Sequence, residues 1–431
     1  MLRFVGLDVH KKVVQACFID SKGKLLSQRR FPCFRDDLIR FGRTYLKKTD
    51  RVALEATTHC WEVAKVLKPF VARVVVSNPK ATKAIAHAKV KTDKVDANIL
   101  AELLRCDFLP TVWEPDEKTR ELRSLTIHRT SMGQQRTAVK NRIHAILHQR
   151  LIQIPEGSLF SRENSRWLED LELDPAGREA LLSELRLLGS LSVEVEAADH
   201  QVILRAYEDP RIKLLMTAPG IDFGVASAVV AAYGDIHRFK TADQAASYLG
   251  LVPSTKQSAD KCYHGPITKH GNSQARWMLT QAAQVVSRHP GPLGAFFRNL
   301  AARRTWNIAV LATARKLAVI IWHMLKHNEP YRYAEPATVK QKLGRLRARA
   351  TGQNRKSTPR RSKASSSDTP DQKAPDGYRF ASIPSLKEVL EAEGLPPQKP
   401  LSAGEQSIID KLHMMDLVGR ISTQQRKLRK A

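Results

Sequence analysis

Four carboxylates stand out in a chain that is otherwise strongly basic. Asp8 lies within a run of apolar, β-forming residues, where a carboxylate is costly unless a cation balances its charge. Glu55 ends a second such run, and Asp93 and Asp96 stand three residues apart at the start of a predicted helix, so they share one face. Acids that converge on one edge of a sheet suit two Mg2+ ions about 4 Å apart, which activate an attacking oxygen and stabilise a leaving oxygen in phosphoryl transfer. The four residues therefore predict a two-ion Mg2+ site.

Each acid also has an ordinary structural explanation when it is taken alone. Asp93 and Asp96 are of the residue type that capping and the helix dipole favour in a first turn. Asp8 could begin a turn, and Glu55 could form an ion pair with a nearby basic residue. The metal site is favoured by the combination of all four acids with the order of the predicted strands and the basic charge of the chain.

The elements that would position these acids form an α/β domain over residues 1–112. Five runs are predicted as strands, at residues 3–10, 13–20, 25–31, 51–55 and 73–76. Short turns join the first three, which indicates antiparallel strands, and the later two alternate with helical patterns, which is typical of a mixed sheet with helices on its faces. If the strand that ends at Glu55 lies beside the strand that holds Asp8, the two carboxylates face each other. A helix over residues 93–105 completes the domain.

The middle of the chain is predicted to be helical. Residues 113–210 carry long apolar repeats, which are typical of an antiparallel hairpin or a coiled-coil dimerisation arm, and ordinary bundle helices fit the same spacing. Residues 211–335 are predicted to form a compact, mainly helical domain. Within it, residues 218–228 resemble a helix-hairpin-helix element, in which Gly220 and Gly224 would let backbone amides approach a phosphate.

The charge of the chain indicates a polyanionic partner. Its 431 residues include 71 Lys and Arg against 43 Asp and Glu, a formal net charge of +28. Each phosphate that a Lys or Arg neutralises releases a condensed counterion, so nucleic acid is favoured over an anionic membrane surface. Residues 336–384 are basic and rich in Ser, Thr and Pro, which predicts a disordered linker, and residues 385–431 are predicted to form a short helical extension.

The same composition excludes several classes of protein. A chain with 42% apolar residues can bury real cores, so it is not a small scaffold that depends on disulfides. Its five cysteines never come within a Cys-x-x-Cys spacing, which indicates neither a disulfide framework nor a zinc knuckle. No clean apolar run is long enough to cross a bilayer, and the first residues lack the features of a signal peptide. We therefore expect a cytoplasmic protein without a membrane partner.

The motifs around the acids resemble those of a known family. Three stretches are similar to the DEDD transposases of bacterial insertion sequences: Gly6 to Lys11, Leu54 to Ala56 and Lys91 to Ala97. Three more are similar to the second transposase domain of that family: Pro219 to Ile221, Tyr248 to Pro253 and Gly265 to Asn272. The resemblance covers residues 3–330 and includes both domains in order. It implies a RuvC-like catalytic domain with an RNase H fold.

The resemblance also implies roles for individual residues. In the family, the four acids bind Mg2+, and a serine of the second domain attacks a DNA phosphate and becomes covalently linked to it. Carried over by motif, this serine is Ser258, although relatives commonly have a Ser-Ser-Gly-Gly-like run where this chain has Gln257 to Asp260. Ser254 therefore remains a competitor. A serine hydroxyl needs activation, which the metal ions could supply if both domains reach one phosphate.

The partners that the resemblance implies are nucleic acids and further copies of the chain. Donor DNA and target DNA would each pair with a non-coding bridge RNA, so that base pairing and not the protein reads the sequence. A dimer or tetramer is expected. The residues expected to contact nucleic acid are Lys89, Lys91, Lys94, Gly220, Gly224, Lys269 and Arg276.

Two other functions fit the same residues. A junction-resolving endonuclease of the same fold would use water as its nucleophile in place of Ser258. A non-catalytic nucleic-acid-binding scaffold would need neither the serine nor the acids. Substitution of Ser258 or Asp8 separates these functions from a recombinase.

Overall fold

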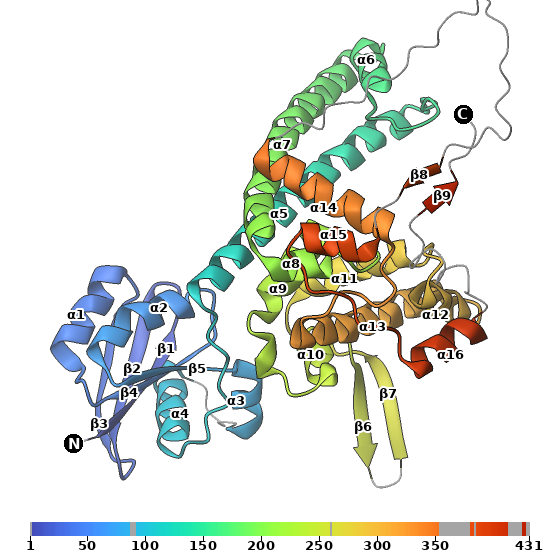
Figure 1. Cartoon of the computed structure of the whole chain (residues 1–431). Helices are drawn as coiled ribbons and strands as arrows, with labels where there is room; N and C mark the ends of the chain where they lie inside the picture. The colour runs from blue at the N-terminus through green and yellow to red at the C-terminus, as the bar shows by residue number, and fades with distance from the viewer. Residues whose placement is uncertain are drawn as a thin grey trace, which may run out of the picture. The chain divides into compact units, whose positions relative to one another are not determined.

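The computed structural model describes two compact units, Met1–Pro115 and Asp116–Ala431 (Figure 1). The residues described are 2–86, 92–258, 261–352, 380–382, 385–412 and 425–427. The first unit ends close to the predicted boundary at residue 112. The helical arm predicted at residues 113–210 is not a separate unit, because from Asp116 onward it belongs to the second unit.

A five-stranded mixed sheet forms the centre of the first unit, as predicted. Its strands are β1 (Arg3–Val9), β2 (Val13–Asp20), β3 (Leu25–Pro32), β4 (Arg51–Glu55) and β5 (Arg73–Ser77). They lie in the order β3-β2-β1-β4-β5, in which β2 is antiparallel to β1 and β3, and β4 is parallel to β1 and β5. The central strand β1 is covered on both faces, which explains its nearly continuous apolar run.

Helices cover both faces of this sheet (Figure 1). Those that pack on the two faces are α1 (Arg35–Tyr45), α2 (Cys60–Leu67) and α4 (Asp93–Arg105), and the unit also contains α3 (Pro79–Ile85) and a short 3-10 turn, η1, at Lys68–Phe70. Val5 and Leu7 of β1 pack in one core with α1 and α2, whereas Phe4 packs in another with Leu100 of α4. Alternate residues of β1 therefore face α1 and α2 on one side and α4 on the other.

Two long helices, α5 (Glu117–Gln149) and α7 (Pro175–Glu208), pair within the second unit, with α6 (Arg162–Asp170) near their far end (Figure 1). Three ion pairs of 2.6 Å set an antiparallel register: Arg129–Asp199, Arg142–Glu184 and Arg205–Glu121. Arg129, which interrupts the apolar repeat, thus pairs across the hairpin. The structure shows this hairpin within one chain, and a coiled-coil contact between two chains stays a prediction.

A helical core forms the body of the second unit. Its helices are α8 (Pro210–Leu215), α9 (Phe223–Tyr233), η2 (Ile236–Arg238), α10 (Ala242–Tyr248), α11 (Ser273–Val286), α12 (Pro292–Ala301) and α13 (Trp306–His327). Val229, Leu279 and Leu317 are fully buried where these helices meet. By length and composition alone, α13 could cross a membrane, but half of its most apolar stretch is buried in this core, as expected for the core helix of a globular domain.

A β-hairpin interrupts this helical unit, which the sequence did not predict. β6 (Pro253–Ser258) and β7 (Lys261–Ile267) pair antiparallel, with Gln257 opposite Cys262. Figure 1 shows the hairpin extending away from the helices. Nearly all of its residues are exposed, so the alternation of apolar and polar residues that identifies a half-buried strand is missing.

The prediction of a disordered linker from residue 336 is wrong for its first part. Residues Pro336–Thr351 form a helix, α14, that buries Val339, Leu343 and Leu346 in the helical core. These three residues recur every three or four positions, so the basic residues between them lie mostly on the outer face. The Lys and Arg residues interspersed with these apolar residues hid the periodicity. Residues 353–379 lie outside the described part of the chain.

The C-terminal extension packs on the same core. α15 (Leu386–Ala392) buries Leu386, Val389 and Leu390 there. α16 (Ala403–Lys411) is tied to the segment before α14 by an ion pair of 3.0 Å between Arg332 and Glu405. Two short strands, β8 (Phe380–Ser382) and β9 (Gln425–Lys427), pair antiparallel. The predicted helical extension is therefore part of the second unit.

Candidate active site

Asp8 and Glu55 occupy corresponding positions on neighbouring strands. β1 and β4 run parallel, and Leu7 lies opposite Leu54. The next residue of each strand is the acid, so the two acids lie at the same end of the sheet. Ala53 packs under α4, and Glu55, two residues later, faces the same side and is partly buried. This arrangement agrees with the predicted neighbourhood of the two strands.

Gly6 allows α4 to lie directly on β1. A Cβ at this position would be 1.9 Å from the carbonyl oxygen of Ala97 and 2.7 Å from the backbone nitrogen of Ala101. No larger residue permits this approach without a shift of the helix. Because Asp8 is two residues after Gly6, it points toward the same helix.

The first turn of α4 carries the other two acids. Thr92 caps the helix, since its hydroxyl accepts a hydrogen bond of 3.3 Å from the backbone N–H of Val95. Asp93 and Asp96 follow within this turn. Asp96 directly precedes Ala97, whose backbone contacts β1 at Gly6. The predicted helix start is confirmed, and the packing of α4 brings its acids to the end of β1.

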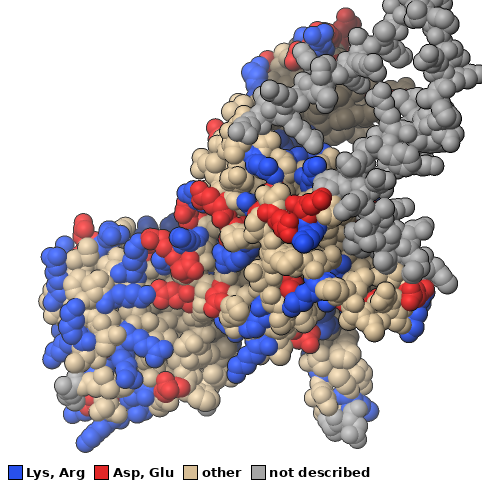
Figure 2. Space-filling model, in the orientation of Figure 1, with Lys and Arg blue, Asp and Glu red and all other residues tan. Residues whose placement is uncertain are grey.

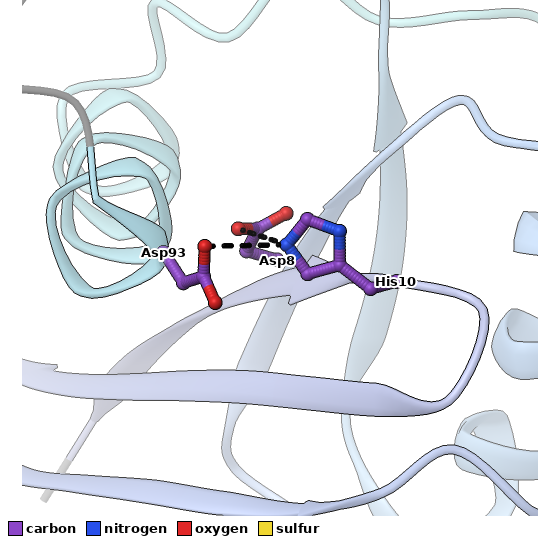
Figure 3. Close-up of side chains that lie close together, drawn as sticks. All are labelled: Asp8, His10 and Asp93. Atoms are coloured by element: carbon purple, nitrogen blue, oxygen red, sulfur yellow. Dashed lines mark hydrogen bonds and ion pairs between the residues drawn. The ribbon is translucent and has the colours of Figure 1, made fainter.

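A compact group of three side chains lies at this point. His10 Nε2 is 3.1 Å from a carboxylate oxygen of Asp8 and 3.4 Å from one of Asp93 (Figure 3). One possible ligand atom from each residue lies within 4.8 Å of the other two. The Asp8 side chain is 17% exposed, whereas those of His10 and Asp93 are about half exposed. The group is thus anchored in the sheet and open to solvent on its outer side.

The electrostatics of the group favour a cation. Burial raises the pKa of Asp8, His10 opposes that shift, and the negative charges of Asp93 and Asp96 add to it. Asp96 lies in the same first turn of α4 as Asp93. A divalent ion would relieve the repulsion among these carboxylates.

The sequence alone indicates no role for His10. In the sequence, His10 is distinguished only by its position two residues after Asp8. This spacing puts both side chains on one face if the strand direction continues. A histidine next to a turn is too common to be singled out on that basis. The structure identifies it because α4, which is distant in sequence, supplies the second acid.

The two candidate nucleophiles lie on the β6–β7 hairpin, in the other unit. Ser258 is the last residue of β6, is exposed, and pairs with Lys261 next to the tip. Ser254 lies near the base, partly buried, with its hydroxyl facing Gly265 of the opposite strand. Ser258 is therefore the more accessible of the two hydroxyls.

Two family models match separate stretches of this chain. The model of the DEDD transposase domain of the IS110 type matches residues 5–151, and the model described as transposase IS116/IS110/IS902 family matches residues 212–298. The chain belongs to the IS110 family of transposases. Its first unit accordingly has an RNase H-like fold, and the family is one of enzymes that act on DNA.

Individual relatives of this transposase cover most of its length. It is 27% identical to the transposase for insertion sequence element IS1111A of Coxiella burnetii, over 77% of this chain and 92% of that protein. It is 28% identical to a probable family 20 transposase of Pseudomonas aeruginosa, over 76% and 98%. A pilin gene-inverting protein of Moraxella bovis is 24% identical, over 76% and 97%. The DEDD domain of this chain suggests use of a divalent metal.

The basic residues expected to contact nucleic acid differ in their surroundings. Lys94 of α4 and Lys269 after the hairpin are exposed. The Arg276 guanidinium donates a hydrogen bond of 2.9 Å to the Leu249 carbonyl, so it ties two segments of the transposase together. Lys89 and Lys91 lie outside the described residues.

Of the two glycines of the helix-hairpin-helix-like element, Gly220 lies between α8 and α9 and Gly224 lies within α9. Gly220 has a φ of +73°, and a Cβ there would be 2.5 Å from the Ala282 carbonyl oxygen. Close packing against α11 thus explains this glycine. Gly224 lies in the first turn of α9, where the Asp222 side chain accepts a hydrogen bond of 2.9 Å from the Val225 N–H. Contact of either glycine with a phosphate stays a prediction.

Proposed function

We propose that this transposase cuts and exchanges DNA strands at a Mg2+ centre held by Asp8, Glu55, Asp93 and Asp96, with Ser258 as the nucleophile. The observation that carries the proposal is the meeting of Asp8 and Asp93 at the end of β1, within 4.8 Å of each other. Two elements far apart in sequence supply these acids, and Gly6 makes their approach possible.

The residues present fit a hard divalent ion. Carboxylate oxygens are the ligands that Mg2+ prefers, and the pKa of Asp8 is raised first by burial and then by the negative charges of Asp93 and Asp96, which a divalent ion would offset. Four acids carry enough charge for two ions, which is the number we propose. When bound, such ions would supply Lewis acidity that stabilises the charge on the attacking and leaving oxygens.

Ser258 would carry out a transesterification. Its hydroxyl loses a proton, Oγ forms a bond to phosphorus, and the bond from phosphorus to a bridging oxygen of the DNA strand breaks. The released oxygen takes up a proton. A serine phosphodiester remains, which the hydroxyl of a second DNA end displaces in the reverse sense to join new strands. The exposure of Ser258 next to the hairpin tip supports its access to a DNA backbone.

The exchange of strands is supported by the named relatives. One of them is a pilin gene-inverting protein, and inversion requires strands to be cut and rejoined in a new order. Retention of the phosphodiester in a serine ester would conserve the bond energy that rejoining needs. We extend this activity to the present chain as a recombinase that moves an insertion element.

We further propose that a bridge RNA guides this reaction by pairing with donor and target DNA. The net charge of +28 supports extensive contact with phosphates, and Figure 2 shows Lys and Arg spread over the visible face of the first unit. The recombinase would act in the bacterial cytoplasm as a dimer or tetramer, so that donor and target strands are cut together.

Trapping of covalent protein–DNA adducts tests the nucleophile. The substrate is a DNA duplex with the joined ends of the insertion element, supplied with the RNA transcribed from the flanking non-coding stretch. Ser258→Ala should abolish both the adduct and cleavage, whereas Ser254→Ala, on the same strand, should retain both. Cleavage by Ser258→Ala without an adduct would instead indicate a junction-resolving nuclease that uses water. Full DNA and RNA binding by the native protein with no cleavage would indicate a scaffold.

A further inference from the structure

His10 has no role in the reaction proposed above, yet its ring lies between two of the acids. Its backbone N–H donates a hydrogen bond of 2.9 Å to the Val13 carbonyl, which fixes the turn between β1 and β2. The side chain is 53% exposed, and its Nε2 points at the Asp8 and Asp93 carboxylates (Figure 3). The backbone therefore holds the imidazole over the end of β1.

The distances from His10 Nε2 to the two carboxylates are those of adjacent ligands around one ion. A divalent ion of the size of Mg2+ or Mn2+ binds its ligands at about 2.1 Å, so adjacent ligands of an octahedron lie about 3.0 Å apart. His10 Nε2 is 3.1 Å from Asp8 Oδ2 and 3.4 Å from Asp93 Oδ1.

We propose that His10 is a protein ligand of the divalent ion that Asp8 and Asp93 hold. This inference rests on the proposed metal centre and adds a nitrogen atom to its oxygen ligands. Mg2+ strongly prefers oxygen, whereas Mn2+ and the later transition ions accept imidazole more readily. His10 thus shifts the preference of the centre toward Mn2+ while Mg2+ still binds.

Binding of Mn2+ to the full-length protein tests this ligand directly. The paramagnetic resonance of free Mn2+ disappears on binding, which gives a Kd, and nitrogen coupling in the pulsed spectrum reports a coordinated imidazole. Competition gives the affinity for Mg2+. His10→Ala should lose the nitrogen coupling and weaken Mn2+ binding by about tenfold or more, with a much smaller effect on Mg2+. His10→Asn, which offers an amide oxygen, should bind Mg2+ like the native protein without regaining the preference for Mn2+.

Two further variants separate the outcomes. Asp8→Asn should lose the binding of both ions, and His128→Ala, which removes an exposed histidine of α5, should change neither. Unchanged Mn2+ affinity and nitrogen coupling in His10→Ala would overturn the role of His10 and leave the metal centre in place. If the native protein shows no Mn2+ binding that depends on Asp8, the metal centre itself is wrong, and the histidine ligand with it.

Discussion

The side-chain nitrogen of Lys342 lies 2.6 Å from the carbonyl oxygen of Ala218, in the turn that leads from α8 to α9. The same nitrogen donates to the carbonyls of Met216 and Ile221, each at 2.9 Å. Burial lowers the pKa of Lys342 to about 8. One basic residue of α14 thus holds together three backbone carbonyls beside the helix-hairpin-helix-like element.

Replacement of Lys342 by Met should destabilise the second unit by about 3 kcal/mol, because three carbonyl oxygens lose their shared donor. The expected result is a lower melting temperature in calorimetry of the full-length protein. Lys340→Met is the matched control, since Lys340 lies on the same helix and is exposed. Equal melting temperatures of Lys342→Met and Lys340→Met would show that the hydrogen bonds of Lys342 contribute little to stability.

Replacement of Gly6 by Ala should force α4 away from β1. The added Cβ meets backbone atoms at 1.9 and 2.7 Å, which no side-chain rotation can relieve, so we expect a loss of about 3 kcal/mol in the stability of the first unit. Mn2+ binding should weaken as well, because Asp93 moves away from Asp8. Gly133→Ala is the control: nothing lies within 4 Å of its Cβ, and it should leave metal binding unchanged. A Gly6→Ala protein with native stability and Mn2+ affinity would refute this account of the packing.

Asp116 should contribute to stability in a way that depends on pH. Its carboxylate caps α5 by accepting hydrogen bonds from the backbone N–H and the hydroxyl of Thr119, at 2.7 and 3.1 Å. The Thr119 backbone hydrogen bond in particular lowers the pKa of Asp116. The stabilisation is therefore complete above the ordinary aspartate pKa of about 3.8 and is lost as the pH falls through the lower, folded-state value.

Two substitutions check this behaviour in urea unfolding. Asp116→Ala should cost about 1 kcal/mol at neutral pH, the usual effect of removing an N-cap. Asp116→Asn keeps an acceptor but cannot ionise, so its deficit relative to the native protein should shrink as the pH falls below about 4. A deficit that does not vary with pH would contradict the assignment.

The charged segment between α14 and β8 should affect binding rather than folding. Residues 353–379 contain seven Lys or Arg and three Asp. Replacement of these residues by a Gly-Ser linker of equal length should flatten the salt dependence of DNA affinity, leaving the melting temperature and strand cleavage intact. A truncation that also removes α14 should unfold the second unit, because Val339, Leu343 and Leu346 lie in its core. Loss of cleavage in the linker variant would contradict the assignment of residues 353–379 to DNA binding alone.

Much of the first unit follows from the sequence because its signals are local. Alternation and turns give the five strands, and the acids at the ends of apolar runs indicate which sheet edge carries the chemistry. The approach of α4 to β1 at Gly6 could not be predicted, since it depends on a contact between residues about ninety positions apart. His10 was missed for the same reason, because its significance depends on Asp93.

The second unit was harder to predict because composition and local pattern point in different directions. In α14, five basic residues are interspersed with the apolar ones, and only a periodicity of three or four residues reveals its buried face. In the β6–β7 hairpin, exposed strands give no alternation at all. Arg129 reads as an interruption of a helical seam until Asp199 of the facing helix supplies its partner.

The most direct test of the central claim is strand cleavage by Asp8→Asn in the presence of Mg2+. This variant keeps the size of the side chain and removes the buried negative charge at the centre of the acid group. With DNA carrying the joined element ends and the flanking RNA, cleavage should fall by at least about a hundredfold while DNA binding and melting temperature stay near those of the native protein. Cleavage within about twofold of the native rate would contradict a metal centre at Asp8.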